Sequence, residues 1–146
     1  MPYLEVKNIK KEYKEFLLDV DFSIEKGELV AIIGPSGGGK STLLSIISGI
    51  EKADEGSIIL DGKDITNEPI EKKNIGFIFQ DYALFSSMNV EKNIEFGMKK
   101  KTKEEKKKET ETLLSLVGLS GYEKRKVDTL SGGEAQRVAL VRSIAA

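Results

Sequence analysis

Two residue types that often carry chemistry are absent from this chain of 146 residues. There is no cysteine, which excludes a disulfide framework and a thiolate metal site. There is no histidine, which removes the commonest metal ligand and a common general base. Both absences narrow the kinds of site that the sequence can build.

Long apolar runs and an excess of either charge are also missing. The apolar runs are far shorter than the roughly 20 residues of a membrane-spanning helix, and the N-terminus lacks a basic-then-apolar signal segment. Lysine and arginine total 23 and aspartate and glutamate total 24, a balance that gives no reason to expect a nucleic-acid partner. Hydrophobic residues make up 39% of the chain. We therefore expect a soluble, cytoplasmic protein of one domain or most of one, whose membrane role, if any, comes through a partner.

One glycine-rich segment has a defined pattern. It matches the phosphate-binding P-loop, G-x-x-x-x-G-K-[ST], at every specified position, through Gly34, Pro35, Ser36, Gly37, Gly38, Gly39, Lys40 and Ser41. Its glycines let the backbone turn tightly and direct several N–H groups at one anion. Lys40 adds a positive charge for the β- and γ-phosphates, and the Ser41 hydroxyl can ligate Mg²⁺. The segment predicts a site for a nucleoside triphosphate and Mg²⁺.

The context of this segment agrees with that interpretation. An unbroken apolar run, 29–33, precedes it and predicts a strand buried on both faces. Apolar residues at helical spacing follow it, and Gly49 is a typical helix end. The alternative, a glycine-rich turn that binds nothing, explains the context less well.

The remaining pattern predicts a mixture of strands and helices. Strands are expected over 4–9, over 18–24 where apolar and polar residues alternate, over 57–60 and 63–65 as a hairpin around Asp61-Gly62, and over 75–79 as a second buried strand that ends at Gln80. Helices are expected over 90–98 and from Thr102 to about Val117, the second opened by a capping box of Thr102 and Glu105 and closed by Gly118. The lysine-rich run from Lys99 to Lys108 fits a solvated helix end better than a patch for RNA or lipid.

A second motif lies about ninety residues after the P-loop. In Leu130-Ser131-Gly132-Gly133-Glu134, Ser131 can cap a helix while Glu134 reaches back to it. The two glycines leave the start of this helix unobstructed, so its amides and dipole offer a second phosphate site. Taken alone, the motif is better read as an ordinary capped helix.

Together, the P-loop, Gln80 and the Leu130–Glu134 motif resemble the nucleotide-binding domain of ATP-binding cassette (ABC) proteins. The resemblance covers essentially all of the chain. It implies an α/β fold in which an incomplete P-loop NTPase core carries an N-terminal antiparallel β subdomain and a helical signature subdomain. Residues 1–146 would form one partial domain, with the β subdomain and P-loop core in 1–80 and the Q-loop and helical subdomain, ending in the signature helix, in 81–146.

The resemblance also assigns roles to residues. It implies that the P-loop residues and Thr42 bind ATP, that Lys40 and Gln80 are catalytic, and that Ser41 and Gln80 hold Mg²⁺. It implies that ATP on an opposite subunit is contacted in trans by Ser131, Gly132, Gly133 and Glu134. Tyr13 falls where the family stacks an aromatic ring on adenine, although packing is an alternative and Phe16 is its nearest rival.

The segment from Gln80 to Phe96 is similar to importer ATPases, such as those serving molybdate or tungstate, polyamines and sugars. That similarity implies an ATP-binding subunit that couples ATP hydrolysis to solute import, as a head-to-tail dimer held by permease subunits at the inner face of the membrane. The aromatic residues here would then contact the permease, or else belong to the core. A soluble ABC ATPase outside transport and a non-hydrolytic nucleotide-binding fragment remain as alternatives.

The family pattern continues beyond the motifs seen here. The Walker B strand, with its Mg²⁺-binding aspartate and catalytic glutamate, and the switch histidine have no counterpart in these residues. We therefore expect the chain to be C-terminally truncated before Walker B. Although the family is an ATPase family, we expect the 146-residue polypeptide alone to turn over ATP poorly.

Overall fold

An antiparallel sheet and a group of helices make up the two halves of the chain. The computed structural model describes residues 1–146. They form two compact units, Met1–Ile75 and Gly76–Ala146, and each is described by itself below. The contacts within the chain divide it between Ile75 and Gly76. The expected division of the domain between residues 80 and 81 stays a prediction.

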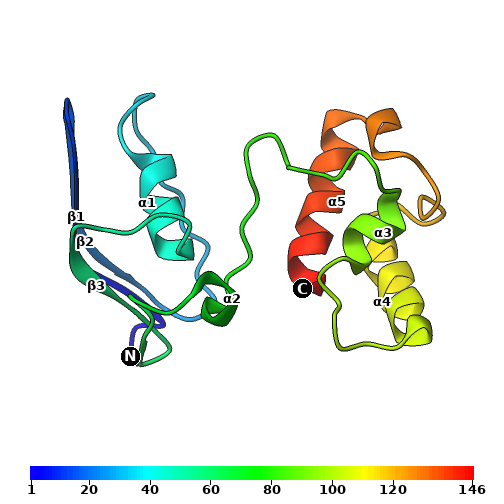
Figure 1. Ribbon diagram of the computed structural model, residues 1–146, viewed down its shortest axis with the longest axis horizontal. Coiled ribbons are helices and arrows are strands. Elements are labelled where there is room, and N and C mark those ends of the chain that lie inside the picture. The colour runs from blue at the N-terminus through cyan, green and yellow to red at the C-terminus, as the bar shows by residue number, and fades with distance from the viewer. The chain divides into compact units, whose positions relative to one another are not determined.

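The first unit contains a four-stranded sheet and two helices (Figure 1). In chain order these are β1 (Leu4–Tyr13), β2 (Phe16–Ile24), α1 (Lys40–Ser48), β3 (Glu55–Leu60), β4 (Lys63–Asp64) and α2 (Ile70–Lys73). The strand order is β2-β1-β3-β4 and every pair is antiparallel. The expected hairpin after β3 is confirmed, since Asp61 and Gly62 both have positive φ, the conformation that a tight hairpin turn needs.

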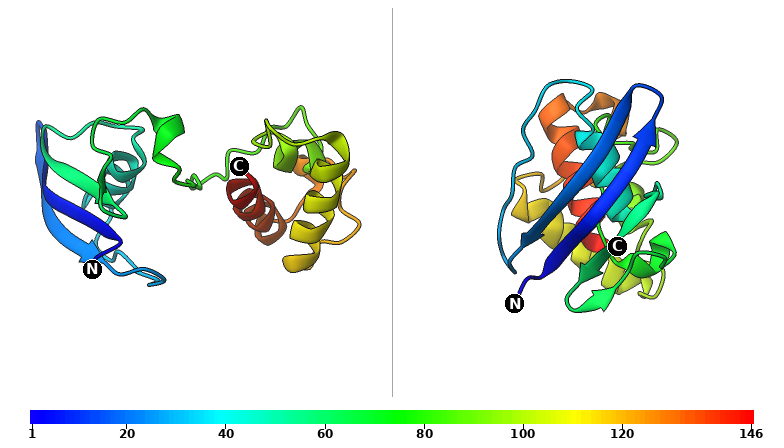
Figure 2. Two further views of the ribbon diagram at one scale, coloured as in Figure 1. Left: turned by 90° about the horizontal axis from the view of Figure 1, so that it is seen from below. Right: turned by 90° about the vertical axis from the view of Figure 1, so that its left-hand side faces the viewer.

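Helix α1 packs on one face of this sheet, as the views in Figure 2 show. Its buried residues Leu43 and Ile46 meet the buried strand residues Val6, Ile9 and Ile58 in one hydrophobic cluster. The helix ends at Gly49, whose φ of 90° is the left-handed conformation predicted for the residue that closes it. The helix begins at Lys40, within the P-loop motif, and its apolar face packs on the sheet.

The buried strand predicted over 29–33 is wrong for this structure. The segment is in no strand, and Leu29 and Ile33 are almost fully exposed. An apolar run becomes a strand only where neighbouring strands accept its backbone hydrogen bonds. The sheet of this unit pairs β1 to β4 with one another and leaves this run without such a neighbour.

The second unit is helical. It contains α3 (Val90–Glu95), α4 (Lys103–Leu116), a 3-10 turn η1 (Val127–Thr129) and α5 (Gly132–Ala145), which lie side by side in Figures 1 and 2. The unit has its own hydrophobic cluster, in which Ile94, Leu114 and Val138 contribute one residue from each of the three α-helices. All three are fully buried.

The predicted capping boxes of this unit are confirmed. The Thr102 hydroxyl accepts a hydrogen bond from the Glu105 amide, and the Glu105 carboxylate accepts one from the Thr102 amide, directly before α4. Ser131 and Glu134 make the same reciprocal pair before α5. The lysine-rich run lies partly in the exposed first turns of α4.

The second predicted buried strand, over 75–79, is also wrong. These residues are unpaired, and Ile78 and Phe79 are more than a third exposed. As with 29–33, no neighbouring strand accepts their hydrogen bonds.

Across the whole chain, none of the helices combines the length and apolar content needed to cross a membrane.

Candidate nucleotide-binding site

The P-loop enters α1 through glycines in the left-handed region. Gly37 has φ of 78° and Gly39 has φ of 86°, values that side chains rarely adopt. The Gly38 amide donates to the Pro35 carbonyl at 3.1 Å, which closes a tight turn, and the Leu43 amide donates to Gly39 at 2.9 Å as α1 begins. The sequence pattern therefore forms a loop that bends sharply into a helix N-terminus.

This helix N-terminus has no side-chain cap. Gly39 has no side-chain oxygen, and the first turn of α1 carries no acidic residue. By contrast, α3, α4 and α5 are capped by the side chains of Asn89, Thr102 and Ser131. The first amides of α1 are thus left to bind an external acceptor, and the helix dipole favours an anion there.

Lys40 places its charge on the same loop. Its ammonium donates to the carbonyl oxygens of Gly34 at 2.7 Å and Pro35 at 2.5 Å. An ammonium has three protons to donate, so these two bonds leave capacity for another acceptor. The loop is otherwise exposed, with Gly34 to Gly38 all open to solvent.

The residues beside Lys40 fit a Mg²⁺ ion that arrives with a nucleotide. Ser41 is exposed in the first turn of α1, and Thr42 is half-buried beside it. The chain contains no group of three or more acidic, histidine or cysteine side chains placed to hold a metal ion. Mg²⁺ is commonly held through one or two protein groups together with substrate phosphates, so a single hydroxyl is an adequate protein contribution.

Two aromatic rings border the start of α1. Tyr13 ends β1 and Phe16 begins β2, and their rings are stacked at 6.3 Å between centroids. A Cβ built on Gly39 would collide with the Phe16 ring, so this ring covers the last glycine of the P-loop. Tyr13 is the more exposed of the two rings. The geometry thus gives Phe16 a packing role and leaves Tyr13 as the accessible ring.

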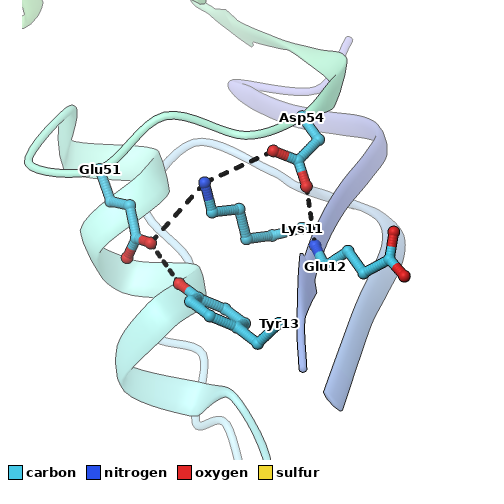
Figure 3. A network of polar contacts seen from close by, with 5 residues as sticks. All are labelled: Lys11, Glu12, Tyr13, Glu51 and Asp54. Atoms are coloured by element: carbon cyan, nitrogen blue, oxygen red, sulfur yellow. Dashed lines mark hydrogen bonds and ion pairs between the residues drawn. The ribbon is translucent and has the colours of Figure 1, made fainter. Parts of the chain in front are cut away.

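Tyr13 also takes part in a polar network (Figure 3). Its hydroxyl donates to the carboxylate of Glu51, in the loop after α1. This bond, followed by burial, raises the pKa of Tyr13 above its ordinary value. Lys11 lies 3.9 Å from the same Glu51 oxygen and 3.5 Å from Asp54. Sequence patterns give no sign of Glu51, because its partner is 38 residues away.

In the second unit, Gln80 is exposed and precedes a turn of unusual backbone geometry. Tyr82 and Ala83 have φ of 65° and 45°, which is rare for residues with a side chain. Arg142 of α5 donates to the carbonyls of Ala83 at 2.8 Å and Tyr82 at 2.9 Å. Its guanidinium also lies 5.4 Å from the centre of the Phe85 ring. Arg142 therefore holds the turn that follows Gln80, which sequence reasoning did not identify.

Asn93 holds the next part of this segment. It is fully buried, its Oδ1 accepts from the Phe85 amide at 2.8 Å, and its Nδ2 donates to the carbonyls of Phe85, Met88 and Asn89. A buried side-chain amide with all these partners fixes a loop in one conformation. The sequence motif included Asn93 but gave no indication of this role.

The motif Leu130–Glu134, called the signature motif below, forms the start of α5. Tyr122, more than the Ser131 amide and hydroxyl, stabilises the Glu134 carboxylate by hydrogen bonding and lowers its pKa to about 2. A Cβ added at Gly132 or Gly133 would meet nothing within 4 Å, so the first turn of α5 lies open. Ser131 and Glu134 satisfy each other, while this open surface leaves room for a group that approaches from outside.

The structure thus assembles the predicted residues in two places. The first unit brings Tyr13 next to the loop and helix start that contain Gly34 to Thr42. The second unit contains Gln80 and, at the start of α5, Ser131 to Glu134. Sequence patterns did not identify Glu51, which bonds Tyr13, or Arg142 and Asn93, which hold the segment after Gln80.

Comparisons with known proteins agree with these motifs. The ABC transporter family model matches residues 17–146. The chain is 49% identical over 146 residues to the sulfate/thiosulfate import ATP-binding protein of Synechococcus elongatus, covering 97% of this chain and 42% of that protein. It is 50% identical over 145 residues to the molybdate/tungstate import ATP-binding protein of Thermococcus kodakarensis, covering 97% and 44%. The chain therefore spans about two fifths of the length of these curated relatives.

A solved structure is similar in fold as well. The dimeric structure of the bacterial ABC transporter cassette MJ0796 superimposes with a TM-score of 0.84 at 31% identity, over 97% of this chain and 69% of that one. The likeness confirms the expected α/β cassette fold, of which this structure forms the antiparallel sheet and the helices. On the family match and on these similarities, the chain belongs to the ABC transporter family.

Proposed function

We propose that this chain is part of the ATP-binding subunit of an ABC importer, which couples the binding and hydrolysis of MgATP to solute import. The observation that carries the proposal is the uncapped, glycine-bounded start of α1 with Lys40 folded over its loop. The names of its relatives, which are import ATP-binding proteins, support the transport role.

In this proposal the first unit binds the nucleotide. The amides of the loop and of the first turn of α1 hold the phosphates, and the Lys40 ammonium turns from the loop carbonyls to the β- and γ-phosphates. The exposed ring of Tyr13 stacks on adenine. Its position beside Thr42, and its stacking on Phe16, which covers the last P-loop glycine, support this role.

The catalytic roles fall to Lys40 and Gln80. Lys40 stabilises charge that develops on the transferred phosphoryl group, and Gln80 orients the attacking water. Ser41 and Gln80 are the residues of this chain that would hold Mg²⁺. When bound, that ion neutralises phosphate charge.

The signature motif acts on a second copy of the subunit. Ser131, Gly132, Gly133 and Glu134 contact the ATP bound to the opposite subunit in a head-to-tail dimer. The open first turn of α5 supports this role, because no side chain blocks an approaching phosphate. The low pKa of Glu134 keeps its carboxylate ionised and engaged with Ser131 at neutral pH.

Permease subunits are the proposed membrane partners, and they would hold the protein at the inner face of the cell membrane. Phe85 and Phe96 support this proposal. Their rings are 4.7 Å apart, and 39% of Phe85 and 55% of Phe96 is exposed. Exposed aromatic pairs are typical of contact surfaces. Retention of the full-length protein by the permease would separate this function from that of a soluble ABC ATPase.

Nucleotide binding is the first test. We expect Lys40→Ala to weaken MgATP binding to the chain by at least about tenfold, since one charge-assisted contact to phosphate is worth about 1.5–3 kcal/mol. Lys26→Ala removes a lysine charge elsewhere, near Tyr3, and serves as the matched control. Equal binding by the wild type and Lys40→Ala, measured by calorimetry, would contradict the proposed site.

The trans role has its own test. In the full-length subunit, Gly132→Asp places a carboxylate on the open turn of α5, where it repels a phosphate. We expect ATP-dependent dimerisation to be lost while each monomer still binds ATP. Loss of ATP binding by the monomer would show that the motif acts in cis.

A further inference from the structure

The hydroxyl of Tyr13 is bound to a carboxylate although its ring is exposed. Tyr13 is 40% exposed at the end of β1, and its hydroxyl donates to Glu51 in the loop after α1 (Figure 3). An exposed tyrosine ring ordinarily samples several rotamers. A hydrogen bond at its far end restricts those rotamers to the ones that reach Glu51.

Glu51 is itself held in place. Its backbone amide donates to the Ser45 carbonyl at 3.1 Å, which ties it to the end of α1. Lys11 lies 3.9 Å from the Glu51 oxygen that accepts from Tyr13. Asp54, which pairs with Lys11, accepts from the backbone amide of Glu12 at 2.8 Å. The acceptor for Tyr13 is therefore fixed from both the helix and the strand.

Phe16 restricts the same ring from another direction. Its ring stacks with that of Tyr13 at 23° between planes, and it packs against Gly39 of the P-loop. With its hydroxyl on Glu51 and Phe16 beside it, Tyr13 has one defined position next to the start of α1.

We infer that Glu51 is a positioning residue for Tyr13, which it holds as a preformed surface for the base of the bound nucleotide. This inference rests on the proposed function, because it concerns the same nucleotide site. Holding a ring in its bound orientation lowers the conformational entropy lost on binding. Glu51 thereby acts on recognition of the base and leaves phosphate binding to the P-loop and Lys40.

A purely structural role for Glu51, which links β1 to α1, makes a different prediction. Loss of that link would disturb the P-loop as a whole and weaken every phosphate ligand. Inorganic triphosphate, which has the phosphates without the base, therefore separates the two roles. Only a positioning role changes the ratio of the affinities for ATP and triphosphate.

The experiment measures that ratio by calorimetry for the wild-type chain, Glu51→Ala, Glu51→Gln and Tyr13→Phe. We expect Glu51→Ala and Tyr13→Phe each to weaken ATP binding about 3- to 10-fold, the range for loss of one hydrogen bond, with triphosphate affinity unchanged. Glu51→Gln keeps an acceptor oxygen and should recover most of the ATP affinity. The double variant should be no weaker than either single variant, because both remove the same contact.

Glu55→Ala is the matched control. This substitution also removes one carboxylate, four residues after Glu51. The Glu55 side chain is two-thirds exposed and pairs only with Lys10, at 3.6 Å. It should leave both affinities unchanged.

A pH titration of Tyr13 tests its hydrogen bond to Glu51 without any nucleotide. The Glu51 bond raises the pKa of Tyr13, whereas Thr42 and the charge of Lys11 lower it. The phenolate absorbance of Tyr13, isolated by subtracting Tyr13→Phe, should therefore titrate at lower pH in Glu51→Ala, which removes this bond, than in the wild type.

Three results would overturn the inference. They are equal loss of ATP and triphosphate affinity in Glu51→Ala, no loss of either, and an unchanged Tyr13 titration in Glu51→Ala. The proposed function fails differently, through a wild-type chain that binds neither ATP nor triphosphate.

Discussion

The two units satisfy their backbone hydrogen bonds in different ways. In the second unit, helices bond within themselves and begin at side-chain caps such as Thr102 and Ser131. In the first unit, β1 to β4 satisfy one another, but the apolar run 29–33 pairs with no strand and is exposed. A helix carries its hydrogen-bond partners in its own sequence, whereas a strand depends on a neighbour.

The largest expected effect comes from replacing a leucine in the packed core of the second unit, compared with leucines that are exposed. Leu114 is fully buried in α4, and Leu114→Ala should lower the unfolding free energy of the second unit by about 2–5 kcal/mol. Leu116, two residues later, is 74% exposed, and Leu116→Ala should cost less than about 0.5 kcal/mol. Hydrogen exchange of the α4 amides in urea gives both values.

Leu29→Ala brings the same chemical change to the first unit. Because Leu29 is fully exposed, we expect a cost below about 0.5 kcal/mol. A cost as large as that of Leu114→Ala would show that 29–33 is packed in solution, and the contrast between the units would disappear.

Buried polar groups provide the next test. Asn93→Ala leaves the backbone groups of Phe85, Met88 and Asn89 without their partner and should cost about 2–4 kcal/mol. Asn67→Ala, at an exposed asparagine of the first unit, is the control. If both changes cost the same in urea denaturation, then Asn93 does not hold this loop.

Helix caps should have a smaller effect. Ser131→Ala removes the cap of α5 and should cost about 1 kcal/mol, as should Thr102→Ala for α4. Ser41→Ala, in the first turn of the uncapped α1, should change stability by less than about 0.5 kcal/mol. A cost at Ser41 equal to that at Ser131 would mean that α1 relies on a serine after all.

The smallest expected effect is a dependence on pH. The pKa of Glu134 is lowered from 4.5 to about 2, so its contribution to stability is present above pH 4.5 and is lost as the pH falls toward 2. Between those values, Glu134→Gln should lose less stability than the wild type. Thermal unfolding at a series of pH values measures this, and parallel curves for the two proteins would contradict the assignment.

The same contrast explains how far the sequence was informative. Both capping boxes, the Asp61-Gly62 hairpin and the end of α1 at Gly49 were predicted correctly, because each is determined by residues a few positions apart. The strands over 29–33 and 75–79 were predicted wrongly. An apolar run indicates burial, but it does not show which strands would pair with it.

The candidate site divides along the same line. The residues proposed to bind phosphate, Gly34 to Ser41, were predicted as one continuous motif, and the structure bends them into a helix start. The contacts that hold Tyr13 and the turn after Gln80 were not predicted. Glu51 reaches Tyr13 across 38 residues, and Arg142 reaches Ala83 across 59, distances over which no local pattern operates.

The hydrogen bonds from Arg142 couple α5 mechanically to the turn after Gln80. With a rise of 1.5 Å per residue, about 16 Å of rigid helix separates Ser131 at one end from Arg142 near the other. Because the guanidinium holds two carbonyls of a turn that is already strained, a tilt of the helix at Ser131 displaces that turn in the same motion. A displacement of the Leu130–Glu134 motif is thus expected to reach the turn next to Gln80 through α5.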